Sequence, residues 1–282
     1  MDLSIITVNT NDGEKLIPQM ESLVLGGEGI TYEHIISDNR STDGSLDKIR
    51  TKFPKAHIVE NGKNIGFGAA NNAALPHATG EYILLLNPDM RVEPGSLKKI
   101  RDWMQVHPDV GIASPKLIQE DGTIQQSALP RRFPGLLDQI AIVFKLPHIF
   151  PSVLNRYLYK GFDPEVEQDV DSVRGSFMLM RREIADTLGW LFDPRYFIWF
   201  EDVDTCREAK KQGFRIVYTP IVSCVDYVGQ TFKRQPSVQK QKWFTESMIL
   251  YFKKWESPWK AIVLRVVRPL GIALTWIHSK IS

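Results

Sequence analysis

The chain has 282 residues, of which 43% are hydrophobic and 24% charged, and its formal net charge at pH 7 is +2. This composition allows one large or two modest globular domains with a substantial core. The small net charge argues against general nucleic-acid binding, and no uncharged apolar run approaches the roughly 18 to 20 residues of a membrane-spanning helix.

The sequence also predicts a reducing cellular setting. Cys206 and Cys224 are not spaced as a metal site, and Met1 leads directly into an expected strand, without the pattern of a signal peptide. We therefore expect a cytoplasmic protein.

Strands and helices alternate along the first part of the chain. Short apolar, β-branched runs predict strands at residues 3–8, 32–37 and 57–60, and helical spacing predicts helices at 46–53 and 69–78. This alternation predicts an α/β fold with a mostly parallel, Rossmann-like central sheet that is flanked by helices.

The strand expected at Tyr82–Leu86 is apolar throughout and runs directly into the turn Asn87-Pro88-Asp89. Ligands of open α/β sheets bind outside the carboxyl ends of the strands, so Asp89 is placed where a phosphate-bound metal could be held. Mg²⁺ and Mn²⁺ bind oxygen ligands, and one or two carboxylates are enough when phosphates and waters complete the shell. A structural role stays open, because Pro-Asp is a common turn former.

The remaining elements are less regular. We expect a helix that is capped at 93–96 and continues through 107, a strand at 110–114, a hairpin at 119–126, strands at 170–173 and 175–180, helices at 182–188 and 205–212, and a last strand at 215–220. Residues 131–162 mix apolar, aromatic and basic side chains with several prolines and predict a surface-lying insertion.

Polar side chains follow three of the expected strands. They are Asn9 and Asp12, Asp38 and Asn39, and Asn87 and Asp89. Such fixed polar groups suit a nucleotide, and the loop 64–68 before a helix could supply backbone amides for a diphosphate. Alternatively, the glycines of this loop have only the structural role of forming a turn. The loop lacks both the Lys-Ser/Thr ending of a P-loop and a dinucleotide fingerprint, which argues against kinases and Rossmann oxidoreductases.

A second acidic centre is Glu201-Asp202-Val203-Asp204, at the start of an expected helix. Capping and the helix dipole explain at least one of these acids, and Asp204 is the candidate for that structural role. The apolar pair Trp199-Phe200 before them could raise a carboxyl pKa and shape a sugar-sized pocket. Asp202 could then act as a general base.

Taken together, these motifs resemble glycosyltransferase family 2, and in particular bacterial rhamnosyltransferases that build O-antigen, as in lipopolysaccharide, and related cell-surface polysaccharides. The match covers about residues 2–232. The motifs that carry it are Asn9 after the opening strand, Asp38-Asn39-x-Ser41-x-Asp43-Gly44-Ser45, Asn64-x-Gly66-Phe67, Leu86-Asn87-Pro88-Asp89, Gly175-Ser176-Phe177, and Phe192-Asp193 with Glu201-Asp202-Val203-Asp204.

The resemblance implies a GT-A fold over residues 1–232, with a nucleotide-binding half at about 1–115 and an acceptor half at about 116–232. It also implies an inverting, metal-assisted transfer of a sugar from a nucleotide diphosphate donor. By position, Thr7, Asn9 and Asp38 resemble contacts to the base and ribose of the donor, and Asn64 lies in the loop near the nucleotide.

The resemblance assigns the acids as well. Asp89 resembles the metal-binding acid of the family's Asp-x-Asp motif, with Asn87 in the place of the first Asp. Asp202 resembles the base that deprotonates the acceptor hydroxyl, and Glu201 a residue that orients the acceptor. Where the family often has His-x-x-Gly-x-Ser, this chain has Asp226 in place of the His. Asp226 is a candidate second ligand for Mg²⁺ or Mn²⁺, although the change equally fits weakened metal dependence or an altered activity.

Residues 233–282 predict a helical extension in which basic residues alternate with Trp, Tyr and Phe. This pattern suits the interface of an anionic bilayer, and acceptors of the family are often polyprenyl-diphosphate sugars. We therefore expect a peripheral contact with the cytoplasmic face of the inner membrane. The alternative is an amphipathic helix that packs on the catalytic domain.

The leading hypothesis is a rhamnosyltransferase that uses dTDP-rhamnose and a saccharide or polyprenyl-diphosphate-linked saccharide acceptor. One alternative is a transferase with another donor, such as a UDP-hexose. The other is a non-catalytic, nucleotide-binding partner in an assembly complex. No nucleic-acid partner is expected.

Overall fold

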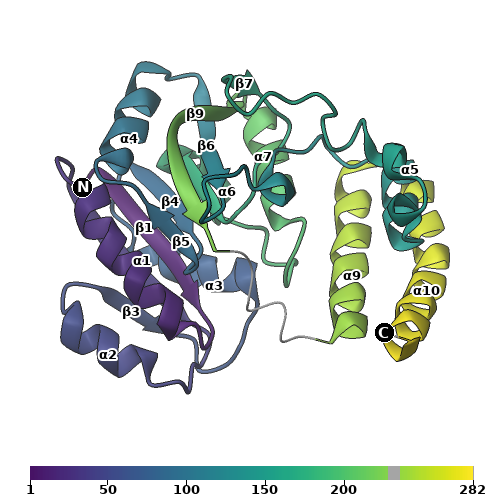
Figure 1. The fold of residues 1–282 in the computed structure, drawn as a ribbon, viewed down its shortest axis with the longest axis horizontal. Helices are drawn as coiled ribbons and strands as arrows, with labels where there is room; N and C mark the ends of the chain where they lie inside the picture. Colours follow the sequence, from purple (N-terminus) through teal and green to yellow (C-terminus); the bar gives the residue numbers. More distant parts are fainter. Residues whose placement is uncertain (228–235, 282) are drawn as a thin grey trace.

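The computed structural model describes residues 1–227 and 236–281, in which helices flank one sheet (Figure 1). The strands are β1 (Leu3–Asn9), β2 (Tyr32–Asp38), β3 (His57–Glu60), β4 (Tyr82–Leu86), β5 (Met90–Val92), β6 (Val110–Ile118), β7 (Gln168–Asp169), β8 (Phe177–Arg181) and β9 (Arg215–Asp226). The helices are α1 (Gly13–Gly26), α2 (Ser45–Lys52), α3 (Phe67–Ala74), α4 (Ser96–Val106), α5 (Leu136–Val143), α6 (Arg182–Leu188), α7 (Glu201–Lys211), α9 (Ser237–Trp255) and α10 (Pro258–Ile281). The predicted α/β class is confirmed.

The strands lie in the order β3-β2-β1-β4-β8-β6-β9-β5, and β7 pairs with β9 off this path. β1 is parallel to β2 and β4, and β2 is parallel to β3. All five residues of β4 are buried, as expected for a continuous apolar run covered on both faces. Because these strands are parallel, their carboxyl ends meet at one edge of the sheet, where the predicted polar side chains follow them.

The other half of the sheet is mixed, since β8 runs antiparallel to both β4 and β6. β6 and β9 are parallel, with a register shift between Ser114 and Lys116. Pro115 lies at this shift and Pro220 lies in the facing stretch of β9, and neither can donate a ladder hydrogen bond. β9 nevertheless continues through Asp226, so the prediction that this strand ends at residue 220 was wrong.

The short strand β5 was not predicted, and it pairs antiparallel with the end of β9 so that Met90 faces Asp226. A predicted strand at 170–173 is also absent. The backbone there makes isolated bonds to distant segments, from Val170 N–H to the Ile216 carbonyl and between Ser172 and Arg131, and these do not extend into a ladder. The nearby strand is instead the two-residue β7.

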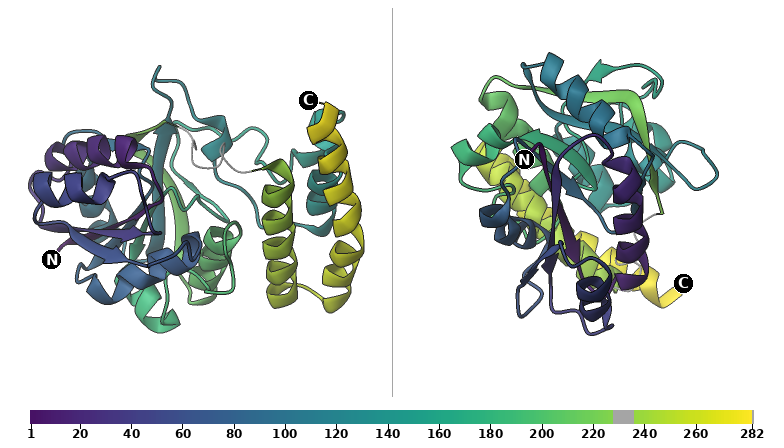
Figure 2. Two further views of the ribbon diagram at one scale, coloured as in Figure 1. Left: turned by 90° about the horizontal axis from the view of Figure 1, so that it is seen from below. Right: turned by 90° about the vertical axis from the view of Figure 1, so that its left-hand side faces the viewer.

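The insertion at 131–162 contains α5 and short 3-10 segments, and α5 packs against α10. α9 and α10 form a helix pair beside the sheet, with α5 on the same side (Figure 2). Their buried side chains form one cluster with the segment before α7, which includes Tyr196 and Phe200. No described helix combines the length and the apolar character needed to cross a membrane.

A buried group of charges joins α9 to α7. Lys254 Nζ lies 2.7 Å from a carboxylate oxygen of Asp204, 2.8 Å from Glu208 and 3.1 Å from Asp193. Trp255 Nε1 donates to Asp204 at 2.6 Å. Burial raises the pKa of Asp204 even against these donors, so this carboxylate depends on Lys254 for its compensation.

We expect Lys254→Met to lower the free energy of unfolding by about 3 kcal/mol, because loss of one partner leaves buried carboxylates uncompensated. Denaturant unfolding of both proteins measures the difference. The matched control is Lys253→Met at the adjacent, exposed position, which should change the value by less than about 0.5 kcal/mol. Equal effects of the two substitutions would contradict this role for Lys254.

Candidate active site

A strand-edge pocket lies where β1, β2 and β4 end. It is an open hollow of about 800 Å³, a volume that includes space open to solvent. Its lining residues are Val8, Thr10, Asp12, Asn39, Asn64, Gly66, Phe67, Asn87, Pro88, Asp89, Phe197, Ile198 and Trp243. Polar groups from three strand ends therefore do converge on one site.

A central pocket adjoins the strand-edge pocket and shares Phe67, Asn87, Asp89 and Ile198 with it. Its remaining lining residues are Ser127, Ala128, Arg174, Gly175, Ser176, Trp199, Glu201, Asp202 and Asp226. The two acidic centres that lie far apart in the sequence are thus walls of one cavity.

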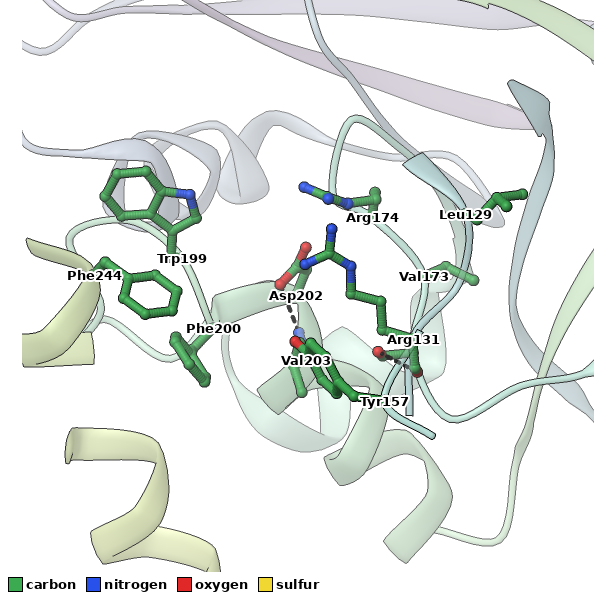
Figure 3. A pocket seen from close by; sticks show the side chains of 11 residues that line it. Leu129, Arg131, Tyr157, Val173, Arg174, Trp199, Phe200, Asp202, Val203 and Phe244 are labelled. Atoms are coloured by element: carbon green, nitrogen blue, oxygen red, sulfur yellow. Dashed lines mark hydrogen bonds between the residues drawn. The ribbon is translucent and has the colours of Figure 1, made fainter. Parts of the chain in front are cut away.

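An arginine pocket continues from the central one (Figure 3). It shares Arg174, Trp199 and Asp202 with the central pocket and no lining residue with the strand-edge pocket. The three pockets therefore form a row, with Asp202 between the strand-edge side and the arginine side.

The turn Asn87-Pro88-Asp89 is held from both sides. The Asn87 backbone N–H donates to the Ser176 carbonyl at 2.9 Å, and the Asn87 carbonyl accepts from Met90 N–H at 3.1 Å. Gln19 Nε2 on α1 also donates to the Asn87 carbonyl. Thr7 Oγ1 donates to Gln19 Oε1 at 3.3 Å, so a chain of hydrogen bonds links β1 to this turn.

The structure places Thr7, Asn9 and Asp38 behind the pocket wall, since none of the three lines the strand-edge pocket. Thr7 is fully buried between Gln19 and His34. Asn9 Nδ2 donates to Asp38 Oδ1 at 2.8 Å, and the other Asp38 oxygen accepts from Ser41 N–H. These contacts favour a role in fixing the loops, and direct contact with a nucleotide stays a prediction for all three.

Asn64 does line the strand-edge pocket, and its Oδ1 accepts from the Gly66 backbone N–H at 2.9 Å. Gly66 has a φ of +89°, and a Cβ there would lie 2.5 Å from the Phe197 carbonyl oxygen. Only glycine tolerates both the conformation and this close approach. The Asn-x-Gly stretch therefore brings the start of α3 against the loop before α7.

Asp89 and Asp226 approach each other through the β5–β9 pairing. Met90 is the register partner of Asp226, and Tyr227 N–H donates to the Asp89 carbonyl at 3.0 Å. Both residues line the central pocket. No cluster of three or more His, Cys, Asp or Glu suited to a metal occurs among the described residues. Two carboxylates still fit Mg²⁺ or Mn²⁺, which take oxygen ligands and fill other positions with water and phosphate.

Glu201 and Asp202 begin α7 directly after a strained turn, in which Trp199 and Phe200 have φ angles of +63° and +67°. Bulky side chains rarely adopt this conformation, and such strain persists only where surrounding packing holds it. Here the Phe244 ring of α9 packs on both, with ring centroids 6.0 Å from Trp199 and 5.4 Å from Phe200. The C-terminal helix therefore supports the turn that positions the acids.

The two acids differ in their surroundings. Glu201 is buried, and burial together with the neighbouring Asp202 charge raises its pKa well above the usual range. This shift favours the protonated form of Glu201, which can donate a hydrogen bond. Asp202 is half-buried, its oxygens accept from Val203 N–H at 2.8 Å and Gly175 N–H at 3.3 Å, and it faces two pockets. Of the pair, Asp202 is the better placed to accept a proton.

Sequence reasoning missed three residues of the site. Arg174 lines the central and arginine pockets, Arg131 lines the arginine pocket, and Trp243 of α9 lines the strand-edge pocket. Trp243 packs on Phe197 with ring centroids 4.9 Å apart. No motif marks any of the three. The only signal was that Arg174 directly precedes Gly175-Ser176-Phe177.

Known proteins are similar to this chain in sequence. The sequence model of the family described as "Glycosyl transferase family 2" matches residues 4–189. An N-acetylglucosaminyl-diphospho-decaprenol L-rhamnosyltransferase of Mycobacterium tuberculosis is 26% identical, over 92% of this chain and 87% of its own. Rhamnosyltransferase WbbL of Escherichia coli is also 26% identical, over 70% of this chain and 73% of its own.

Solved structures with a similar fold include the mannosyltransferase PcManGT of Pyrobaculum calidifontis, in complex with GDP-Man and Mn²⁺. It matches with a TM-score of 0.60 and 18% identity, over 98% of this chain and 73% of its own. The S. aureus TarS fragment 1-349, in complex with UDP-GlcNAc, matches with a TM-score of 0.57 and 18% identity, over 89% of this chain and 65% of its own. These likenesses confirm the predicted GT-A fold.

Proposed function

The chain belongs to glycosyltransferase family 2, and we propose that it is an inverting rhamnosyltransferase that moves L-rhamnose from dTDP-rhamnose to a saccharide or lipid-linked saccharide in cell-surface polysaccharide synthesis. One observation carries the proposal. Asp202, Asp89 and Asp226 line a single central pocket, with the strand-edge pocket on one side and the arginine pocket on the other. A donor and an acceptor could therefore meet at Asp202.

In the proposed reaction the nucleotide lies in the strand-edge pocket, and its sugar reaches into the central pocket. The acceptor hydroxyl gives its proton to Asp202 and forms a bond to the anomeric carbon of the donor sugar. The bond between that carbon and the diphosphate breaks on the opposite face, which inverts the configuration. Glu201 orients the acceptor, and its raised pKa favours the protonated form that donates a hydrogen bond.

Asp89 and Asp226 are proposed to hold a divalent cation, with Asn87 beside them on the same wall. When bound, the cation would neutralise charge on the leaving diphosphate. The β5–β9 ladder supports this assignment, because it pairs Asp226 with Met90, the residue directly after Asp89.

Rhamnose is proposed as the sugar because two relatives that match most of this chain are named rhamnosyltransferases. A lipid-linked acceptor is proposed because one of them is named for a diphospho-decaprenol substrate. Another similar protein, RfbC of Myxococcus xanthus, is named for O-antigen biosynthesis, although this chain covers only 19% of it. These names support a role in polysaccharide assembly.

A peripheral contact with the cytoplasmic face of the inner membrane is also proposed, through an exposed apolar stripe on α10. Figure 2 shows α10 as the outer helix of the α9–α10 pair. The stripe has helical spacing and consists of Trp259, Ile262, Val266, Leu270, Leu274 and Ile277. Exposed Leu137, Ile149 and Phe150 lie on or close after α5, which packs beside α10. Exposed Arg265 and Lys280 add positive charge, which suits anionic lipid headgroups.

The catalytic proposal is tested by turnover of dTDP-rhamnose, UDP-glucose, UDP-N-acetylglucosamine and GDP-mannose on an alkyl diphospho-N-acetylglucosamine acceptor. We expect dTDP-rhamnose to be used best. Asp202→Asn should lower kcat about 10²- to 10⁴-fold, because it removes the base, and leave the dissociation constant for the donor nearly unchanged. Asp186→Asn, at an exposed carboxylate on α6, is the control. Full turnover by Asp202→Asn would contradict the assignment of the base.

The metal assignment is tested by the shift in melting temperature that dTDP causes, measured with Mn²⁺ and with EDTA. We expect a larger shift with Mn²⁺, since tighter nucleotide binding stabilises the native state more. Asp89→Asn and Asp226→Asn should both reduce this difference, and Asp186→Asn should preserve it. A shift that is the same in EDTA and in Mn²⁺ would count against both ligands.

The membrane contact is tested by sedimentation with vesicles of phosphatidylglycerol and phosphatidylethanolamine. The double substitution Ile262→Glu and Val266→Glu should weaken binding at least about tenfold, because two side chains lose their apolar burial. Val106→Glu, at an exposed apolar position on α4, should bind as the unmodified chain does. If the unmodified chain stays in the supernatant, this part of the proposal fails.

A further inference from the structure

The arginine pocket differs from the rest of the site in its charge. Figure 3 shows the guanidinium groups of Arg131 and Arg174 pointing toward the carboxylate of Asp202, with Trp199 and Phe244 on the other side of the cavity. Two cations thus face one anion in a confined space, and the opposite wall is aromatic. This arrangement favours binding of a negatively charged group beside an apolar or sugar surface.

Arg174 is half-buried, and among the described residues its guanidinium donates only to the backbone carbonyl of Ser127. Its Nε is buried and has no hydrogen-bond partner among the described residues. Burial and the nearby charge of Arg131 lower the pKa of Arg174 to about 10, although Asp202 and Asp226 act in the opposite direction. Arg174 therefore remains a cation at neutral pH with donor capacity left unused.

Arg131 is held in place through its backbone. Its N–H donates to the Ser172 carbonyl at 3.2 Å, and its own carbonyl accepts from Ser172 N–H at 3.1 Å. Its guanidinium carbon lies 5.7 Å from the centre of the Tyr157 ring, and its Nη2 lies 3.4 Å from the Ser127 carbonyl. Within residues 1–227 and 236–281, neither Arg131 nor Arg174 forms an ion pair with a carboxylate. Because the Arg131 backbone is fixed and neither guanidinium pairs with a carboxylate of the described residues, binding of an external anion is favoured.

The row of pockets indicates which substrate would bring this anion. The arginine pocket shares Asp202 with the central pocket but no residue with the strand-edge pocket at the ends of β1, β2 and β4. The diphosphate of a donor in the strand-edge pocket would lie toward Asp89, across the central pocket from Arg131. An anion beside Arg131 therefore belongs to the acceptor.

We propose that Arg131 and Arg174 bind a phosphate or diphosphate on the anomeric carbon of the acceptor sugar, while Asp202 takes the proton from a hydroxyl of that sugar. Guanidinium groups suit this ligand because their fork of donors matches phosphate oxygens. The inference rests on the proposed glycosyl transfer and adds the residues that bind the phosphate of the acceptor and select for it. Arg131 is the residue that tests this inference specifically, because it lines the arginine pocket alone, whereas Arg174 also lines the central pocket.

The test compares two acceptors, octyl diphospho-N-acetylglucosamine and octyl N-acetylglucosaminide, which differ in the diphosphate. We expect kcat/KM to favour the charged acceptor, and Arg131→Met to reduce this preference about 10- to 100-fold, because charge-assisted hydrogen bonds are lost. The KM for the donor should not change. The matched control is Arg132→Met at the next, exposed position, whose guanidinium stacks on Tyr159. This control should keep the full preference for the charged acceptor.

Binding of the two octyl acceptors is measured separately by calorimetry, with and without the donor nucleotide. If Arg131→Met lowers turnover of both acceptors equally, or raises the KM for the donor, the inference is overturned while glycosyl transfer stands. If the chain turns over no donor but binds the charged acceptor through Arg131, the anion site stands and the proposed function fails. If the charged acceptor binds no better than the neutral one, the anion site is overturned.

Discussion

The antiparallel pairing of β5 with the end of β9 is the constraint on which the site depends. β9 begins as a parallel partner of β6, shifts register where Pro115 and Pro220 interrupt the ladder, and then reaches β5. The pairing of Met90 with Asp226 brings Asp226, at the end of β9, next to the turn that follows β4. Without it Asp89 would be one carboxylate at a strand edge. With it, the carboxylates of Asp89 and Asp226, the proposed metal ligands, share the wall of a cavity that Asp202 also lines.

The second constraint is the packing of α9 on the turn before α7. Trp199 and Phe200 have left-handed backbone conformations that cost energy for bulky residues, and Phe244 and Tyr251 of α9 pack on that turn. The direction of Asp202 at the start of α7 therefore depends on a helix that follows the catalytic motifs in the sequence. The same helix is tied to α7 by Lys254, so its position relative to the acids is fixed from both ends.

Elements that are encoded by a continuous local pattern could be predicted from the sequence. The buried strand Tyr82–Leu86 was found because five apolar residues end at a polar turn, and the family motifs correctly indicated the family and the GT-A fold. β5 was missed because Met-Arg-Val carries no local pattern and is stabilised by a strand far along the chain. The end of β9 was missed because Pro220 reads as a terminator. Arg131 and Arg174 could not be found, since isolated arginines in irregular segments acquire a meaning only when the fold brings them together at Asp202.

The C-terminal helix α9 lines the candidate site, and this bears on how the chain divides into domains. Adjacent residues Trp243 and Phe244 point in directions about 100° apart on α9 and line the strand-edge and arginine pockets respectively. The predicted division between residues 232 and 233 falls outside the described residues, so the boundary itself stays a prediction. One helix nevertheless contacts both ends of the row of pockets, and α10, which packs on it, carries the exposed apolar stripe. Because α9 lies between this stripe and the arginine pocket, the proposed acceptor needs an apolar tail long enough to pass α9 if its charged sugar head is to lie near Asp202 while the tail contacts α10.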